Sequence, residues 1–112
     1  MRHQRTRLRA TDFPPLYVGY TLTRRDANGE YDVDTLIHFR VTGYSPGGGD
    51  GWHEPRYAAE IETEFDGADL ETADEVPLTE LETATLREWF ESRAGQGAAW
   101  EAANDAIREM GE

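Results

Sequence analysis

The feature that most constrains the fold is a strict two-residue alternation in RYAAEIETEFD, residues 56–66. Every second residue from Tyr57 to Phe65 is apolar or threonine, and the intervening residues from Glu60 to Asp66 are acidic. Because successive side chains of a β-strand point to opposite faces, the pattern predicts a strand with one face on a core and one in water. At 112 residues the chain has the size of one domain.

Two earlier segments, residues 16–24 and 32–44, alternate in the same way. The Asn28-Gly29 pair between them predicts a hairpin with a type I′ turn, which needs positive φ at both central residues. The three segments therefore predict an antiparallel meander, and residues 75–78 are a candidate for a short fourth strand. The expected inward faces of the first two strands are Leu16, Val18, Tyr20 and Leu22, and Val33, Thr35, Ile37, Phe39 and Val41.

The C-terminal third has the apolar spacing of helices. Thr79 and Glu82 form a T-x-x-E capping box that opens the first helix, and Gly95 or Gly97 is expected to end it. Its apolar side is expected to comprise Leu81, Leu86, Trp89 and Phe90, and residues 98–110 carry a second stripe of Trp100, Ala103, Ile107 and Met110. The predicted fold is α+β: a three- to four-stranded antiparallel meander followed by two C-terminal amphipathic helices, at least one of which packs on the sheet.

The chain divides into a flexible basic arm, residues 1–13, and a single α+β domain, residues 14–112. The arm contains Arg2, Arg5, Arg7 and Arg9 and lacks the apolar core of a secretory signal. No cysteine is present, and no apolar run reaches the roughly 18–20 residues that span a bilayer. These features predict a cytoplasmic protein with no membrane association.

The 23 acidic residues and 11 arginines give a net charge of -12, and the acidic residues concentrate after residue 59. One interpretation is solubility, and the other is an acidic surface that docks onto a basic partner. Arg24 and Arg40 are expected to pair across strands with the glutamates of residues 60–64. The candidate binding residues are Glu60, Glu62, Glu64 and Asp66, extended by Asp69, Glu71, Asp74 and Glu75.

The glycine-rich stretch SPGGGDGWHEP, residues 45–55, lacks the lysine of a phosphate-binding loop. Asp50, His53 and Glu54, with His38 from the neighbouring strand, have metal-ligating side chains but no rigid element to hold them. We therefore predict a long hairpin loop with no metal and no cofactor. Trp52 is expected to fold back over the sheet edge, and the alternative is an exposed binding anchor together with Tyr44.

The sequence does not point to catalysis or to direct nucleic-acid binding. There is no cysteine nucleophile. A glycosidase-type pair needs one carboxylate that is buried, whereas the glutamates of residues 60–64 alternate outward into water. The net negative charge opposes binding to phosphate groups. We therefore predict a protein that is not an enzyme and does not bind nucleic acid directly.

Residues 39–62 resemble a group of small phage- and prophage-encoded proteins that have no known activity. In that group a strand runs into a Tyr-x-Pro-Gly turn, then a variable loop, then a strand that reads Ala-Glu-Ile-Glu. The matching residues here are Tyr44, Pro46, Gly47, Pro55, Ala59, Glu60, Ile61 and Glu62. The resemblance implies a phage or prophage origin and an accessory role in a bacterial host.

Together these observations predict a non-enzymatic accessory protein that binds an unidentified host or phage protein through its acidic face. Two alternatives remain open. The acidic face could imitate a phosphate backbone and inhibit a host DNA- or RNA-binding protein, because alternate strand residues lie about 6.5–7 Å apart. Alternatively, the Trp100 stripe could join two copies as a homodimer.

Overall fold

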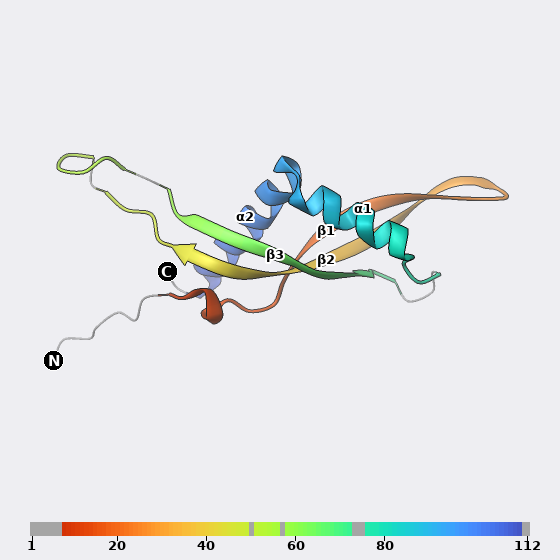
Figure 1. Ribbon diagram of the computed structural model, residues 1–112, viewed down its shortest axis with the longest axis horizontal. Helices are drawn as coiled ribbons and strands as arrows, with labels where there is room; N and C mark the ends of the chain where they lie inside the picture. The colour runs from red at the N-terminus through yellow and green to blue at the C-terminus, as the bar shows by residue number, and fades with distance from the viewer. Residues whose placement is uncertain (1–7, 50, 57, 73–75, 111–112) are drawn as a thin grey trace.

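The computed structural model describes residues 8–49, 51–56, 58–72 and 76–110. Three strands, β1 (Leu16–Asp26), β2 (Gly29–Ser45) and β3 (Glu60–Leu70), form an antiparallel sheet in the order β1-β2-β3 (Figure 1). A short 3-10 helix, η1 (Ala10–Asp12), precedes the sheet, and the helices α1 (Glu80–Glu91) and α2 (Arg93–Glu109) follow it. The predicted α+β meander with two C-terminal helices is confirmed.

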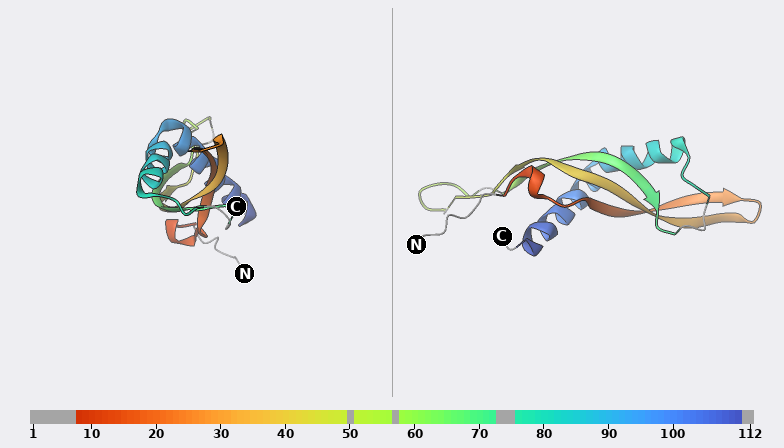
Figure 2. Two further views of the ribbon diagram at one scale, coloured as in Figure 1. Left: turned by 90° about the vertical axis from the view of Figure 1, so that its right-hand side faces the viewer. Right: turned by 90° about the horizontal axis from the view of Figure 1, so that it is seen from below.

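Both helices contribute to one core on a single face of the sheet, where α2 crosses the strands at a steep angle to α1 (Figure 2). Leu86 and Phe90 of α1 and Ala99 of α2 are almost fully buried against the strands. The rings of Phe39 and Phe90 pack with centroids 5.4 Å apart. The strand residues of this cluster are Val18, Leu22, Ile37 and Phe39.

The inward face predicted for β2 is confirmed, because every odd residue from Val33 to Val41 is buried. Thr35 is the polar member of this row, and its hydroxyl donates a hydrogen bond of 2.6 Å to the carbonyl of Tyr20. A buried hydroxyl with a partner avoids the desolvation cost of an unpaired one. The even residues from Glu30 to Thr42 therefore face away from the helices. A register shift between Val41 and Gly43 reverses the alternation beyond that point, where Tyr44 pairs with Ile61.

The β1–β2 hairpin lies where the sequence predicts it, but its turn is different. Asp26 pairs with Gly29, so the two-residue loop is Ala27-Asn28. Asn28 does not have positive φ, whereas Gly29 has φ of 120°. The backbone N–H of Asn28 donates to the Asp26 carboxylate at 2.7 Å. This local bond holds the turn, and the predicted type I′ turn is therefore wrong.

The third strand begins and ends about four residues later than predicted. It continues past residue 66 because a register shift between His38 and Phe39 leaves Asp66 without a cross-strand partner and returns Ala68 to the core face opposite Ile37. Such a bulge lets a strand continue with its alternation reset. The connection predicted for residues 67–77 therefore starts only after Leu70. Residues 76–78 are not a strand, and residue 75 of the predicted fourth strand lies outside the described residues.

The break between the helices is at Ser92 and not at a glycine. Ser92 is the C-cap of α1 and the N-cap of α2, and its hydroxyl oxygen accepts a hydrogen bond from the Gly95 N–H at 3.3 Å. Gly95 and Gly97 lie inside α2, so the prediction that one of them ends the first helix is wrong. The capping box of Thr79 and Glu82 at the start of α1 is confirmed.

In α1, Leu86 and Phe90 are buried and Trp89 is half-buried, as predicted, whereas Leu81 is 78% exposed and the prediction for it is wrong. The buried face of α2 is rotated from the predicted one. In α2 the buried residues are small, namely Gly95, Ala99, Ala103 and Ala106. Trp100 and Met110 lie at the edge of this stripe and are 42% and 36% exposed. Small residues allow α2 to approach the sheet and α1 closely, which a Trp100-centred face would prevent.

One ion pair joins β1 to the start of α1. The Arg24 guanidinium donates two hydrogen bonds to the Glu82 carboxylate, at 2.7 and 2.8 Å, and a third to the Val76 carbonyl at 2.8 Å. Both side chains are mostly buried. The prediction that Arg24 pairs with the glutamates of β3 is therefore wrong. The hydrogen bond from Arg24 lowers the pKa of Glu82 to about 2, with a further contribution from the Thr79 N–H.

This pair should make folding stability sensitive to acid. The ordinary pKa of Glu82 is 4.5 and the folded-state pKa is about 2, so its stabilisation is present above pH 4.5 and is lost as the pH falls toward 2. At neutral pH, Glu82→Gln is expected to lower the free energy of unfolding by about 1–3 kcal/mol. Urea denaturation at several pH values should show the gap between variant and wild type closing over that range. A gap of constant size would contradict this assignment.

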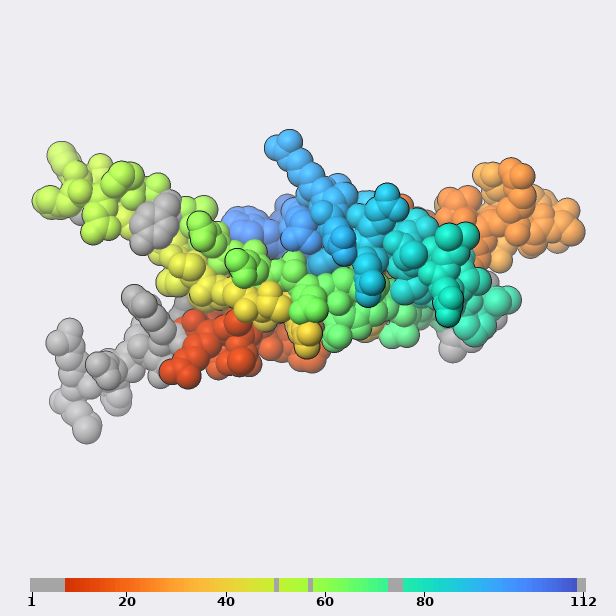
Figure 3. Space-filling view, viewed as in Figure 1, coloured from red at the N-terminus to blue at the C-terminus, as the bar shows by residue number. Residues whose placement is uncertain are grey.

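The molecule is elongated, with principal extents of 66 × 30 × 18 Å. The β1–β2 hairpin projects from one end, and the connection between β2 and β3 projects from the other (Figure 3). The accessible surface is 8600 Å² for 12.7 kDa, whereas a compact monomer of that mass exposes about 6,200 Å². The core is therefore confined to the middle of the molecule, and much of the strand surface is open to solvent.

Candidate functional site

The outer face of the sheet, opposite the helices, is strongly acidic. Its side chains come from the even residues of β2 between Glu30 and Thr42 and from alternate residues of β1 and β3. Eight carboxylates and two arginines lie on it, so the face carries a formal charge of −6 with His38 neutral. The carboxylates are those of Glu30, Asp32, Asp34, Glu60, Glu62, Glu64, Asp66 and Asp69, and the arginines are Arg25 and Arg40.

Five of these carboxylates follow β3, the edge strand, and we call them the acidic row: Glu60, Glu62, Glu64, Asp66 and Asp69. All five residues are exposed. The structure thus brings together all four acidic residues selected from the sequence and adds Asp69 from the predicted extension. Glu71 is exposed beyond the end of β3, and residues 74 and 75 lie outside the described residues.

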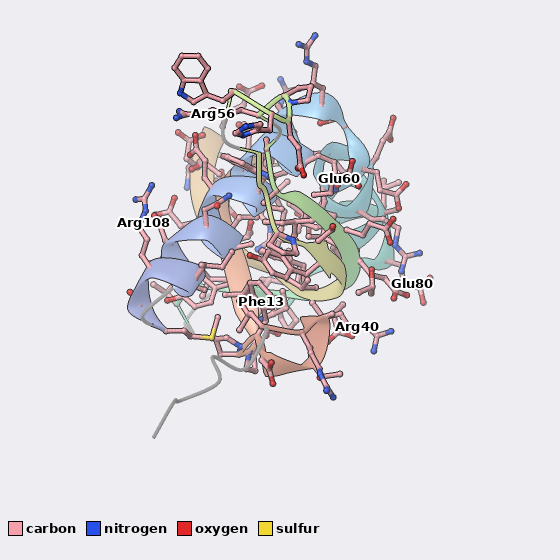
Figure 4. The ribbon with its side chains drawn as sticks, turned by 90° about the vertical axis from the view of Figure 1, so that its left-hand side faces the viewer. Phe13, Arg40, Arg56, Glu60, Glu80 and Arg108 are labelled. Carbon is pink, nitrogen blue, oxygen red and sulfur yellow. The ribbon has the colours of Figure 1, made fainter. Side chains whose placement is uncertain are left out.

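Two members of the acidic row are paired with side chains of β2. Arg40 contacts Glu64 at 3.0 Å, as the sequence predicts, and Nε2 of His38 lies 2.8 Å from the Asp69 carboxylate. Glu60, Glu62 and Asp66 form no ion pair with any residue in the described part of the chain. Arg40 projects away from α2, on the opposite side of the molecule from Arg108 (Figure 4). The row therefore presents three carboxylates without such a partner beside two that are paired.

A groove of about 540 Å³ lies along this face, between the segment that enters the sheet and the outward side chains of β2 and β3. Phe13, Pro14 and Pro15 form its apolar wall. The charged wall consists of His38, Arg40, Asp66 and Asp69. The sequence did not indicate that residues 10–15 border the acidic row. Pro14-Pro15 was the available cue, because two prolines prevent this segment from continuing β1 as a paired strand.

The part of the predicted arm that the structure describes contributes to this groove. Residues 10–12 form η1, which contacts β2, and the rings of Phe13 and Tyr44 meet edge to face at 5.5 Å. Tyr44 is half-buried by this contact and pairs with Ile61 across the sheet. Tyr44 therefore supports the entering segment and does not extend into solvent.

Trp52 lies on the connection that projects beyond the sheet and is 91% exposed. The expectation that Trp52 folds back over the sheet edge is therefore wrong. Its side chain is exposed, as the alternative prediction stated. The connection extends away from the core instead of returning to it (Figure 1).

His38, the proposed strand member of a metal set, pairs instead with Asp69. Across the described ranges, no cluster of three or more His, Asp or Glu side chains has the geometry to hold a metal ion, and residue 50 lies outside those ranges. Neither helix is long and apolar enough to cross a membrane, as judged on the same residues.

Comparison of the chain with protein-family models, with curated proteins and with solved structures gives no match. The outer face of the sheet therefore has to be interpreted from its own chemistry.

Proposed function

We propose that this chain is a non-enzymatic accessory protein that binds a basic protein partner through the acidic row. The observation that carries the proposal is the asymmetry of the sheet. One face holds the helices and the core, whereas the other is left open with eight carboxylates against two arginines. A surface of one sign attracts partners of the opposite sign and orients them as they approach.

The pattern of ion pairs favours a protein partner over the alternative of nucleic-acid mimicry. A phosphate backbone is uniformly negative, whereas Arg40 and His38 interrupt the acidic row at Glu64 and Asp69. The groove beside the row also has an apolar wall, Phe13 to Pro15, which a protein side chain can fill. Trp52, on the projecting connection, is the apolar anchor that we expect to contact the same partner, because tryptophan is enriched among energetically dominant interface residues.

Self-association as a homodimer is less favoured by the surface. The large exposed apolar side chains are distributed over different elements, with Tyr17 on β1, Leu81 on α1 and Trp100 on α2. Isolated exposed apolar residues are common on monomeric proteins. The resemblance of residues 39–62 to phage and prophage proteins supports a cytoplasmic accessory role in a bacterial host.

The proposal is tested by retention of partners from a bacterial lysate on the tagged protein, followed by elution with a rising salt gradient. Replacing Glu60 and Glu62 by glutamine is expected to weaken retention of the specific partner by about five- to tenfold, because two unpaired interface charges are lost. Partner proteins are identified by mass spectrometry at each salt step.

The matched control replaces Glu88 and Glu91 by glutamine. These carboxylates are exposed on α1, on the helical side of the sheet, and the control changes the net charge by the same amount. Equal loss of retention in both double variants would indicate a general effect of net charge. That result, or unchanged retention in both, would argue against the acidic row as the binding surface.

A further inference from the structure

The first nine residues match the acidic row in both charge and spacing. Arg5, Arg7 and Arg9 occupy alternate positions, and Arg2 lies near the start of the chain. Glu60, Glu62 and Glu64 alternate along β3 with their side chains on one face. In an extended chain, side chains two residues apart lie on the same side at about 6.5–7 Å. An extended arginine segment can therefore align its guanidinium groups with these carboxylates.

The entering segment begins next to the correct part of the sheet. The contact between Phe13 and Tyr44 fixes it beside the last residues of β2. In that region Ser45 pairs with Glu60 and Gly43 pairs with Glu62. Neighbouring strands are about 4.8 Å apart, whereas residues 2–8 can span more than about 20 Å when extended. The length of the segment is therefore sufficient to reach the row in the same molecule.

The Glu62 side chain lies over Gly43 of β2. A Cβ atom placed on Gly43 would lie 2.7 Å from Oε2 of Glu62, so the carboxylate occupies the space that a side chain at position 43 would fill. Glu62 makes no ion pair with the residues that the structure describes. This carboxylate is therefore held over β2, the strand that the entering segment also contacts.

We propose that residues 2–9 bind across the acidic row of the same chain, with arginine side chains paired to Glu60 and Glu62. Hydrogen bonds between guanidinium and carboxylate groups are strong because both partners are charged. Attachment in the same molecule provides an effective concentration that a free segment lacks. The inference rests on the proposed function in one respect, since an external basic partner would displace this segment from the same carboxylates.

The test uses the full-length chain, which contains no cysteine. Gln4→Cys provides a single attachment point for a nitroxide spin label, and the broadening of backbone amide signals is measured by NMR. At about 10 mM salt, where the Debye length is about 30 Å, residues 43–45 and 60–62 are expected to lose most of their signal intensity. At about 1 M salt, where that length is about 3 Å, the signals should recover.

Two variants and one mixture complete the test. Glu60→Gln with Glu62→Gln should abolish the broadening at low salt, whereas Glu88→Gln with Glu91→Gln should retain it. Broadening confined to residues 10–16 would overturn the proposal. Broadening seen only when labelled and isotope-enriched molecules are mixed would overturn it as well, because the segment would then bind a second copy. Because no partner is present, the result is independent of the lysate experiment, and failure of one proposal is distinguishable from failure of the other.

Discussion

Replacing Leu86 by alanine is expected to lower the free energy of unfolding by about 2–5 kcal/mol, enough to remove a large part of the stability of a small domain. Leu86 is fully buried and belongs to the core cluster with Ile37 and Phe39. Because the core occupies only the middle of an elongated molecule, few other side chains can fill the cavity. Chemical denaturation monitored by circular dichroism measures the change.

Leu81 provides the matched control, since it is the same residue type in the same helix. Its side chain is 78% exposed, so Leu81→Ala is expected to change the free energy of unfolding by about 0.5 kcal/mol or less. Both substitutions change the intrinsic helix propensity by the same amount. The difference between their effects on the free energy of unfolding therefore reports the burial of Leu86. Comparable losses in both would contradict the orientation of α1 on the sheet.

Gly95→Ala is expected to destabilise the protein by about 3 kcal/mol, and Gly97→Ala to stabilise it by about 0.5–1 kcal/mol. A Cβ on Gly95 would lie 2.2 Å from the Trp89 carbonyl oxygen and 2.5 Å from the Phe90 Cα, both backbone atoms of α1. Backbone atoms cannot rotate away, so α2 would have to move. A Cβ on Gly97 meets nothing within 4 Å, and only the gain in helix propensity remains.

Thermal or urea unfolding of the two glycine variants provides the measurement. Each serves as the control of the other, because both add one methyl group two residues apart in the same helix. If both variants changed the free energy of unfolding in the same direction, Gly95 would not lie close to the backbone of α1 at Trp89 and Phe90. Partial rescue of Gly95→Ala by a second change in α1 is not expected, since the contacts are with its backbone.

The open acidic face depends on how these helices pack. Because α1 and α2 both cover the inward side chains of the sheet, the acidic row of β3 remains exposed on the opposite face. All eleven basic residues of the Lys/Arg type are arginines, and four of them lie within the first nine residues, a segment that contains no acidic residue. Both proposals therefore concern the same surface, occupied in one case by a partner and in the other by the chain's own N-terminus.

The sequence by itself determined the elements that depend on local periodicity and local hydrogen bonds. Alternation from Val33 to Val41 and from Glu60 to Phe65 identified the strands and their faces, because strand side chains alternate whatever they pack against. The Thr79–Glu82 capping box identified the start of α1, since its bonds span only three residues. The cluster of acidic residues on β3 was likewise visible before any tertiary contact was known.

Only the tertiary structure decided which competing option each ambiguous residue takes. Arg24 pairs with Glu82 because the start of α1 comes within hydrogen-bond distance of β1, a contact between residues 58 positions apart. Gly95 lies inside a helix because the first helix ends at Ser92 and a second begins there. At its closest approach to α1, α2 then needs a residue without a side chain. Trp52 is exposed because the connection that carries it extends away from the core. In each case the outcome depends on the distance between two elements. The periodicity of one segment carries no information about that distance.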